Sequence, residues 1–382
     1  MREVKHVLQL CHGYKPPFFD VARQWARLFK GVEACSGVEF SVTTIFLTGP
    51  RDDSVVDCVG SDEVVFLENT SKDIRGLKRK QISQLKAICK EKDYCLGIAH
   101  RYKPLYILSH VPELPVIGVH HAFGDYVRRT RQWYINRKRK QIALFAVSDA
   151  VRDDIRSSLP KLSKEQIGTL YNRVDYFALR SAQLDRETAR QKLGLSANDY
   201  IFANVGRLHP DKDQRTLIDG FSKVIEKLPL AKLVILGKGR LESELKLQVS
   251  SLQLEDRVLF LGMVPDGYKY FKAFDSFVLS SDHEPFGMVL LEAMAAGLPI
   301  ICSNCGGGRE VVNGCGYLFA MGDERALAQN MRRLYDLDEL EISSLQVRMD
   351  QYVMAKFSDG AVKEQFWSSP FMQKWLSSNS MV

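Results

Sequence analysis

The stretch DHEPFGMVLLEAMAAGLPIICSNCGGGREV, from Asp282 to Val311, sets two glutamates eight positions apart and then adds three consecutive glycines. An apolar run over residues 274–281 precedes it and predicts a buried strand that ends in polar residues. Residues 288–296 are rich in Leu, Ala and Met, which predicts a helix. Glu284 is then expected in the loop before this helix, with Glu292 about one and a half turns inside it.

The start of this expected helix suits a ligand that carries both phosphate and polyol groups. The backbone N–H groups of Gly287, Met288 and Val289 would have no helical partner, and a pyrophosphate would accept hydrogen bonds from them. Carboxylates are poor phosphate ligands but good acceptors for sugar hydroxyls. Glu284 and Glu292 beside an anion site therefore indicate a nucleotide sugar, although either glutamate taken alone would be read as a solvated acid.

A second strand-loop-helix pattern covers residues 200–221 and places cations where the first places carboxylates. Its loop holds Gly206, Arg207 and Lys212 directly after an apolar strand. The planar fork of an arginine and the point charge of a lysine beside a glycine suit a diphosphate. The alternative for this loop is a solvated basic surface.

Several segments together resemble the successive motifs of the retaining GT-B glycosyltransferases of family GT4. These segments are AVSDAV (146–151), LYNRVD (170–175), GRLHPDK (206–212), ILGKGR (235–240), VLFLGMV (258–264) and HEPFGMVLLEAMAAGLPIICSNCGGGREVV (283–312). The resemblance implies an α/β fold with two Rossmann-like domains whose parallel sheets face a cleft. Residues 1–175 would bind the acceptor, residues 186–355 would bind a UDP- or GDP-linked sugar, and helices in 356–382 would pack back on the first domain. It also implies transfer without a metal ion or other cofactor.

The resemblance assigns roles to individual residues. Arg207 and Lys212 would neutralise the donor diphosphate and stabilise the leaving group, while Glu284 would bind the transferred sugar and Glu292 the ribose. The remaining donor contacts would come from Gly13, Gly287, Met288 and Val289 at the diphosphate, Phe286 and Glu310 near the sugar, and Lys238 and the strand end 258–261, which starts at Val258, near the base.

The catalytic histidine of the family is expected at the end of a strand in the first domain. Residues 115–121 read PVIGVHH, an apolar strand that ends in two histidines, and either His120 or His121 matches. We favour His121 because it is the last residue before the small Ala122. By resemblance this histidine contacts the donor sugar, and the acceptor attacks from the face that the leaving phosphate departs from. Without the other motifs, a histidine at a strand end would be read as structural.

Two positions depart from the family pattern. After the apolar run 4–10, the segment CHGYKPPF (11–18) keeps Gly13 where the family often has a Gly-Gly pair, and it adds Lys15. In the segment 172–175, Arg173 replaces the glycine that relatives usually carry. Because of the first change, the loop after residues 4–10 is expected to contact the donor differently than in the family. The second change puts a bulky cation near the expected linker.

Charge is distributed unevenly along the chain. Residues 1–170 contain 28 Lys and Arg against 19 Asp and Glu, whereas the whole chain of 382 residues has a net charge of +7. The segment DYVRRTRQWYINRKRKQ (125–141) interleaves cations with aromatic residues, which predicts contact with anionic lipid or a phosphorylated glycolipid acceptor. A solvated helix face is the alternative. Nucleic acid is disfavoured because no nucleic-acid-binding motif accompanies the charge.

The apolar runs and the cysteines indicate where the protein works and whether it holds disulfides or zinc. No apolar run approaches the roughly 18 residues of a membrane span, and the N-terminal residues lack the apolar core of a secretion signal. A cytoplasmic location is expected, with peripheral contact on the inner face of the membrane if the basic segment binds lipid. The eight cysteines are scattered, so free thiols are favoured over disulfides or a zinc site.

Three other functions fit parts of the sequence. A dinucleotide dehydrogenase is disfavoured because Gly237 and Gly239 are followed by Glu242 where the third glycine of the motif belongs. A nucleotide-sugar epimerase of the same build would use the same donor pocket without an acceptor. A non-catalytic subunit would keep the fold and bind only the nucleotide sugar. By resemblance, we expect a hexosyltransferase similar to bacterial enzymes of lipopolysaccharide or other cell-surface polysaccharide biosynthesis.

Overall fold

The computed structural model describes residues 3–15, 18–31 and 38–379, and the chain divides into two compact units. Unit 1 comprises residues 1–147, 151–170 and 363–382, and unit 2 comprises residues 148–150 and 171–362. Pro16 and Pro17 of the segment after the first expected strand lie outside the described residues. So do Cys35 and the last three residues of the expected C-terminal helices.

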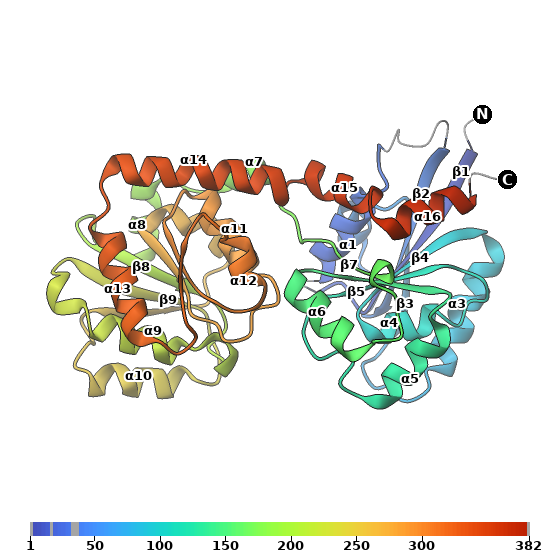
Figure 1. The fold of residues 1–382 in the computed structure, drawn as a ribbon, viewed down its shortest axis with the longest axis horizontal. Coiled ribbons are helices and arrows are strands. Elements are labelled where there is room, and N and C mark those ends of the chain that lie inside the picture. The colour runs from blue at the N-terminus through green and yellow to red at the C-terminus, as the bar shows by residue number, and fades with distance from the viewer. Residues whose placement is uncertain (1–2, 16–17, 32–37, 380–382) are drawn as a thin grey trace. The chain divides into compact units, whose positions relative to one another are not determined.

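Unit 1 is built on a parallel sheet of seven described strands in the order β3-β2-β1-β4-β5-β6-β7 (Figure 1). The strands are β1 (Glu3–Cys11), β2 (Val38–Thr48), β3 (Glu63–Asn69), β4 (Tyr94–His100), β5 (Val116–His120), β6 (Ile142–Ala146) and β7 (Ile167–Thr169). The helices are α1 (Phe18–Arg27), α2 (Asp53–Val59), α3 (Arg79–Glu91), α4 (Tyr102–Leu108), α5 (Arg129–Lys138), α6 (Asp149–Ser158), η1 (Lys164–Gln166) and α16 (Pro370–Asn379). Strands β4, β5 and β6 are almost wholly buried, as expected when helices cover a parallel sheet.

Unit 2 is built on a parallel sheet of six described strands in the order β10-β9-β8-β11-β12-β13. The strands are β8 (Tyr200–Val205), β9 (Ala231–Leu236), β10 (Val258–Gly262), β11 (Ser276–Leu279), β12 (Ile300–Ser303) and β13 (Tyr317–Phe319). The helices are α7 (Tyr176–Ala182), α8 (Arg186–Leu193), η2 (Pro210–Lys212), α9 (Gln214–Ser222), η3 (Ile225–Lys227), α10 (Glu242–Ser251), η4 (Gly267–Ala273), α11 (Met288–Ala295), α12 (Gly306–Val311), α13 (Glu324–Tyr335) and α14 (Glu339–Lys356). One core cluster joins Phe202 of β8, Phe221 of α9 and Met331 of α13.

The C-terminal helices return to unit 1, as the sequence predicted. Helix α15 (Asp359–Trp367) leads into α16, and the indole of Trp367 donates a hydrogen bond to the Leu28 carbonyl at 3.0 Å. Phe366 packs edge-on against Trp25 of α1, with ring centroids 5.7 Å apart. The Trp375 indole donates to the Cys95 carbonyl of β4 at 3.3 Å. Buried aromatic rings with satisfied N–H groups therefore fix this segment on the sheet of unit 1.

The departure at Arg173 has a structural explanation within unit 2. Its side chain is buried, and Arg173 Nε lies 2.6 Å from Asp359 Oδ1. The neighbouring Val174 donates its backbone N–H to the Phe357 carbonyl at 3.1 Å. The arginine therefore anchors the chain that leads into unit 2 to the junction between α14 and α15.

Two further findings concern the described residues only. None of the helices seen there is both long enough and apolar enough to cross a bilayer. The seven described cysteines are free thiols, and Cys305 of the Cys302-x-x-Cys305 pair donates to the Ser281 carbonyl at 2.9 Å. Burial raises the pKa of both thiols of this pair, which is typical of structural cysteines.

Candidate functional site

The sheet of unit 2 has one topological switch point, between β8 and β11, where the strand order reverses. In open parallel sheets, ligands bind outside the carboxyl ends of the strands at such a point. The loop after β8 carries Arg207 and Lys212, and the loop after β11 carries Glu284. The topology thus brings together the two loops that the sequence had singled out separately.

A buried ion pair joins these two loops. Lys212 Nζ lies 2.7 Å from Glu284 Oε2, and the two side chains are only 17% and 9% exposed. Ser281 donates to the same carboxylate oxygen at 3.3 Å, and Ser280 donates to the Lys212 carbonyl at 2.8 Å. Because a buried charge is costly unless it is paired, these contacts fix both side chains at the switch point.

The glycine run at the start of α12 holds the Glu284 loop by close backbone contact. A Cβ atom on Gly307 would lie 2.3 Å from the Pro285 carbonyl oxygen, so no larger residue fits there. Gly307 also donates its N–H to the Glu284 carbonyl at 2.7 Å. A Cβ atom on Gly308 would lie 3.5 Å from Glu284 Cγ. The run from Gly306 therefore positions the glutamate.

Helix α11 begins at the same place with free backbone donors. Gly287 precedes it with a φ of 96°, in the left-handed region that favours glycine. Within the described residues, the N–H groups of Met288 and Val289 donate to no acceptor. Free N–H groups at the start of a helix, together with the helix dipole, suit an anion.

Glu292 lies inside α11 and is half-buried. Burial raises the pKa of its carboxyl group to about 7. In the part of the chain that the structure describes, no hydrogen-bond donor or cation holds this carboxyl group. A half-buried carboxyl without a partner is available to accept hydrogen bonds from a ligand hydroxyl.

Phe286 and Glu310 are tied to the interior of unit 2. The Phe286 ring is buried, with its centroid 5.6 Å from that of Phe357, so only its backbone is free to face a ligand. The Tyr171 hydroxyl donates to Glu310 Oε2 at 3.3 Å, and Tyr352 donates to the Glu310 carbonyl at 2.7 Å. Burial raises the pKa of Glu310.

The loops after β8 and β9 pack backbone against backbone. Gly237 has a φ of 137°, and a Cβ atom there would lie only 1.8 Å from the Gly206 carbonyl oxygen. Arg207 is 70% exposed, so its guanidinium is accessible beside this contact, and it pairs with Asp211 at 3.2 Å. The exposed Lys238 extends toward the end of β10, where a Cβ atom on Gly262 would lie 3.3 Å from Lys238 Cε.

Val258 does not join the other predicted residues. It begins β10, where it pairs with Leu233 near the start of β9, and its side chain is buried in the core. Because parallel strands run in one direction, Val258 lies at the amino end of the sheet, while Lys238 follows the carboxyl end of β9. Val258 itself therefore begins the strand, and of the predicted strand end 258–261 it is the last residues, next to Gly262, that lie on the side of Lys238.

In unit 1, the two candidate histidines follow one another at the end of β5 but differ in their contacts. His120 is fully buried, and both ring nitrogens are bonded, Nδ1 to Asp125 at 2.6 Å and Nε2 to the Tyr126 hydroxyl at 2.9 Å. His121 is half-buried, and its Nε2 lies 3.4 Å from His100 Nδ1. Burial lowers the pKa of His121 to about 3, with Arg101 and His120 acting in the same direction, so its ring is neutral at pH 7.

The switch point of the unit 1 sheet lies between β1 and β4, and Gly13 and His100 follow or end these strands. Gly13 is buried against β2, where a Cβ atom would lie 2.9 Å from Thr48 Oγ1, so close packing explains its presence. His100 is buried, and burial holds its pKa well below its usual range. This histidine was not among the predicted residues, although the apolar run before it carries the same strand-end signal that identified His120 and His121.

Comparison with known proteins gives a consistent picture. Residues 185–353, which cover most of unit 2, match the family model described as glycosyl transferases group 1. N-acetyl-alpha-D-glucosaminyl L-malate synthase of Bacillus anthracis is 31% identical over 207 residues, which are 53% of this chain and 52% of the relative. The chain spans about half the length of this and several other curated relatives that it matches.

Two further matches extend over more of the chain. An Escherichia coli UDP-Gal:alpha-D-GlcNAc-diphosphoundecaprenol alpha-1,3-galactosyltransferase is 27% identical over 318 residues, or 79% of this chain and 81% of the relative. The crystal structure of HepE from Anabaena, in complex with UDP and glucose, superposes with a TM-score of 0.75 at 20% identity, covering 98% of this chain and 99% of HepE. The latter likeness shows a shared GT-B fold.

Proposed function

We propose that this chain is a retaining hexosyltransferase of family GT4, because residues 185–353 match the model of the group 1 glycosyltransferases and the fold is that of the GT-B proteins. It would move a hexose from a nucleotide sugar to a glycan or lipid-linked acceptor. The observation that carries the proposal is the Lys212–Glu284 pair at the switch point of unit 2, beside the free N–H groups of α11. This arrangement offers a cation and helix amides to a diphosphate and a carboxylate to a sugar.

We assign the donor contacts as follows. Lys212 and the exposed Arg207, with the N–H groups of Gly287, Met288 and Val289, would hold the diphosphate. Glu284 would accept hydrogen bonds from the transferred sugar, and Glu292 would accept them from the ribose. The backbone of Phe286, together with Glu310, would border the sugar, and Lys238 with Gly262 would border the base. In this assignment the cations would stand where the leaving group gains charge and would stabilise the transition state without rearrangement.

In the proposed reaction, the bond between the anomeric carbon and the diphosphate oxygen breaks with its electron pair on that oxygen. The acceptor hydroxyl forms the new bond on the same face and gives its proton to the departing phosphate. His121, neutral at pH 7, would hydrogen-bond the sugar, whereas both nitrogens of His120 are already occupied. Gly13 lies at the end of the strand from which a further diphosphate contact would come.

The acceptor and the cellular setting are proposed from the relatives. HepE was solved with UDP and glucose, and the E. coli relative is named for UDP-Gal and a diphosphoundecaprenol acceptor. We therefore propose UDP ahead of GDP, a lipid-linked or glycan acceptor bound by residues 1–175, and a role in cell-surface polysaccharide or lipopolysaccharide synthesis. Residues 186–355 would bind the donor, without a metal ion. The protein would work in the cytoplasm, on the inner face of the membrane.

Helix α5 supports the membrane contact. Trp133 is 63% exposed, and Arg137 lies over its ring at 5.8 Å from the centroid. Val127, just before the helix, is 72% exposed. Cations beside exposed aromatic and aliphatic groups suit an anionic interface. Equal flotation on anionic vesicles by the wild type and by a variant with the cations of residues 128–140 neutralised would refute this contact.

A transfer assay tests the central proposal. Purified protein is incubated with radiolabelled UDP-hexoses and with short-chain diphospho-lipid acceptors, with and without EDTA, and the products are separated by chromatography. The proposal expects label on the acceptor in amounts matched by released UDP. Conversion of one UDP-hexose to its epimer without an acceptor would identify an epimerase. Donor binding without any turnover across the acceptor panel would identify a binding subunit.

A further inference from the structure

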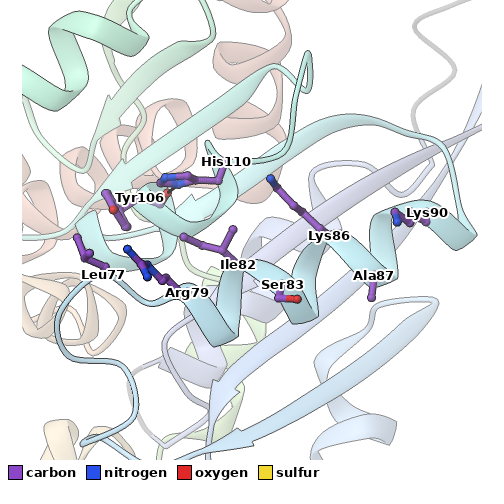
Figure 2. A pocket seen from close by; sticks show the side chains of 9 residues that line it. All are labelled: Leu77, Arg79, Ile82, Ser83, Lys86, Ala87, Lys90, Tyr106 and His110. Atoms are coloured by element: carbon purple, nitrogen blue, oxygen red, sulfur yellow. Dashed lines mark hydrogen bonds between the residues drawn. The ribbon is translucent and has the colours of Figure 1, made fainter.

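A cavity of about 660 Å³ lies on unit 1 between α3 and α4, apart from every residue assigned above (Figure 2). Arg79, Lys86 and Lys90 line it from α3, and Tyr106 and His110 line it from α4 and the turn after it. Figure 2 shows the side chains of both helices around the same hollow. The volume is in the range that small-molecule sites occupy.

The sequence of α3 places these cations on one face. Arg79, Ile82, Lys86 and Lys90 are spaced by three or four residues, which is the helical repeat. Lys86 and Lys90 are separated by one turn, so their like charges repel each other. These cations repel one another in the empty protein, and a bound anion would relieve that repulsion.

The acidic residues of the described chain leave these cations unpaired. No carboxylate lies within ion-pair distance of Arg79, Lys86 or Lys90 in the parts that the structure describes. The nearby Lys78 has its pKa lowered by burial and then by Lys103 and Arg131, which are also cations. Lys78 Nζ lies over the Tyr106 ring, 5.1 Å from its centroid, so this further cation stands beside the aromatic wall of the cavity.

The opposite wall is aromatic and firmly held. The Tyr106 ring packs on His110 and on Tyr134 of α5, with centroids 4.7 Å apart in both pairs. The Tyr134 hydroxyl lies 2.8 Å from Ser109 Oγ and 3.2 Å from His110 Nδ1. The pocket thus combines exposed cations of α3 with an aromatic wall from α4, and Ile82 adds an apolar side chain between the cations on α3.

We propose that this pocket binds a phosphate-bearing group, with the phosphate among Arg79, Lys86 and Lys90 and the attached carbon portion against Tyr106 and Ile82. An arginine fork and two ammonium groups suit the several oxygens of a phosphate. The phosphate has two possible sources, a soluble phosphorylated molecule or a lipid head group. This inference goes beyond the proposed sugar transfer and rests on unit 1 alone.

The test compares two triple variants that lose the same charge. One removes the pocket cations as R79Q/K86Q/K90Q, and the other removes Lys161, Lys164 and Lys374, which are exposed elsewhere on unit 1, as K161Q/K164Q/K374Q. Hydrogen exchange of peptides from residues 77–91 is followed as pyrophosphate or glycerol phosphate is added. Reading only these peptides separates the pocket from any binding of the same anions in unit 2. Flotation on phosphatidylcholine vesicles with and without phosphatidic acid forms the second arm.

The pocket variant is expected to weaken binding about tenfold, while the control variant stays within about twofold of the wild type. If the pocket variant binds pyrophosphate or glycerol phosphate more weakly than the wild type, the ligand is a soluble phosphorylated molecule. If the pocket variant loses only the binding to vesicles that contain phosphatidic acid, the ligand is a lipid head group. Either result supports the site. The proposal is overturned if the pocket variant matches the wild type in both arms, or if the control variant loses as much binding. Equal thermal melts of the three proteins confirm that folding is unchanged, since all six side chains are exposed.

Discussion

The carboxyl ends of the two sheets share a topology but differ in chemistry. In unit 2, the switch point holds opposite charges, Lys212 and Glu284, joined at 2.7 Å. In unit 1, the corresponding edge holds His100 and His121, whose pKa values are both lowered by burial, so that the rings are neutral at pH 7. The comparison teaches that one parallel-sheet scaffold can carry a charged edge, which suits the charged donor proposed above, and an edge whose histidine rings are neutral.

The backbones of the two edges differ as well. In unit 2, Gly237 and Gly307 approach carbonyl oxygens so closely that an added Cβ atom would lie 1.8 Å and 2.3 Å from them. In unit 1, a Cβ atom added to Gly13 would lie 2.9 Å from Thr48 Oγ1, which belongs to a side chain and not to the backbone. The unit 2 edge is thus fixed by backbone packing that only glycine allows, which is why its sequence motif is so specific.

The largest effect is expected from breaking the charged edge. Lys212→Ala should lower kcat/KM for the nucleotide sugar about a hundredfold, because it removes a cation from the developing negative charge and leaves Glu284 unpaired. Lys223→Ala serves as the control, since Lys223 forms a surface pair with Glu324 on the same unit. Steady-state kinetics with a labelled donor would measure both. Comparable activity of the two variants would contradict the assignment of the charged edge.

The second prediction separates the two histidines of unit 1. His120→Ala should lower the free energy of unfolding by about 2 kcal/mol, because it leaves Asp125 and the buried Tyr126 hydroxyl without their partner. His121→Ala should melt near the wild-type temperature but lose about tenfold in kcat.

Thermal melts and initial rates of the two variants, measured side by side, check this split. A fully active His121→Ala protein together with a stable, inactive His120→Ala protein would reverse the two roles.

The third prediction contrasts the pH dependence of the two edges. The folded-state pKa of Glu292 is about 7 against an ordinary 4.5, so the folded protein holds more protons and becomes less stable as pH rises from about 4.5 to 7. The pKa of His121 is about 3 against 6.5, so its contribution makes the protein more stable as pH rises between these values.

Glu292→Gln should therefore be more stable than the wild type at pH 8, by up to about 3 kcal/mol at about 1.4 kcal/mol per pKa unit, and no more stable at pH 4.5. His121→Asn should instead reduce the increase in the free energy of unfolding that the wild type shows as pH rises from about 3 to 6.5. Urea unfolding at a series of pH values measures both slopes, and parallel curves for the wild type and Glu292→Gln would contradict the buried, unpartnered carboxyl.

The smallest effect is expected away from both edges. Arg173→Ala removes a buried guanidinium from Asp359, whose side chain is 45% exposed, so the coupling should be modest, about 1 kcal/mol. A double-mutant cycle with Asp359→Asn measures it. A coupling energy near zero would show that Arg173 acts through its packing alone.

The fold was predictable because its signals are local. Apolar runs ended by polar residues identified β8, β11 and β5, and the glycine motifs identified the loops after them. The pairing of Lys212 with Glu284 was not predictable from spacing, because 72 residues separate them and only the sheet order brings them together.

The errors and omissions have the same origin. The sequence does not show which end of the strand 258–262 faces the site, because this depends on register, here the pairing of Val258 with Leu233. The buried ring of Phe286 follows from its contact with Phe357, which is distant in the chain. The pocket between α3 and α4 was missed because a basic helix face reads as solvated until a second helix covers one side of it.

Nucleotide binding by the charged edge is the most direct test of the whole interpretation. The melting temperatures of the wild type, Lys212→Ala and Lys223→Ala are recorded with UDP, GDP, ADP, CMP and dTDP and their hexose conjugates, since a ligand of the native state raises the melting temperature. We predict that one class of nucleotide, with UDP the first expectation, raises the melting temperatures of the wild type and Lys223→Ala but not that of Lys212→Ala. An equal shift in all three proteins, or no shift with any nucleotide, would contradict a donor site at the switch point of unit 2.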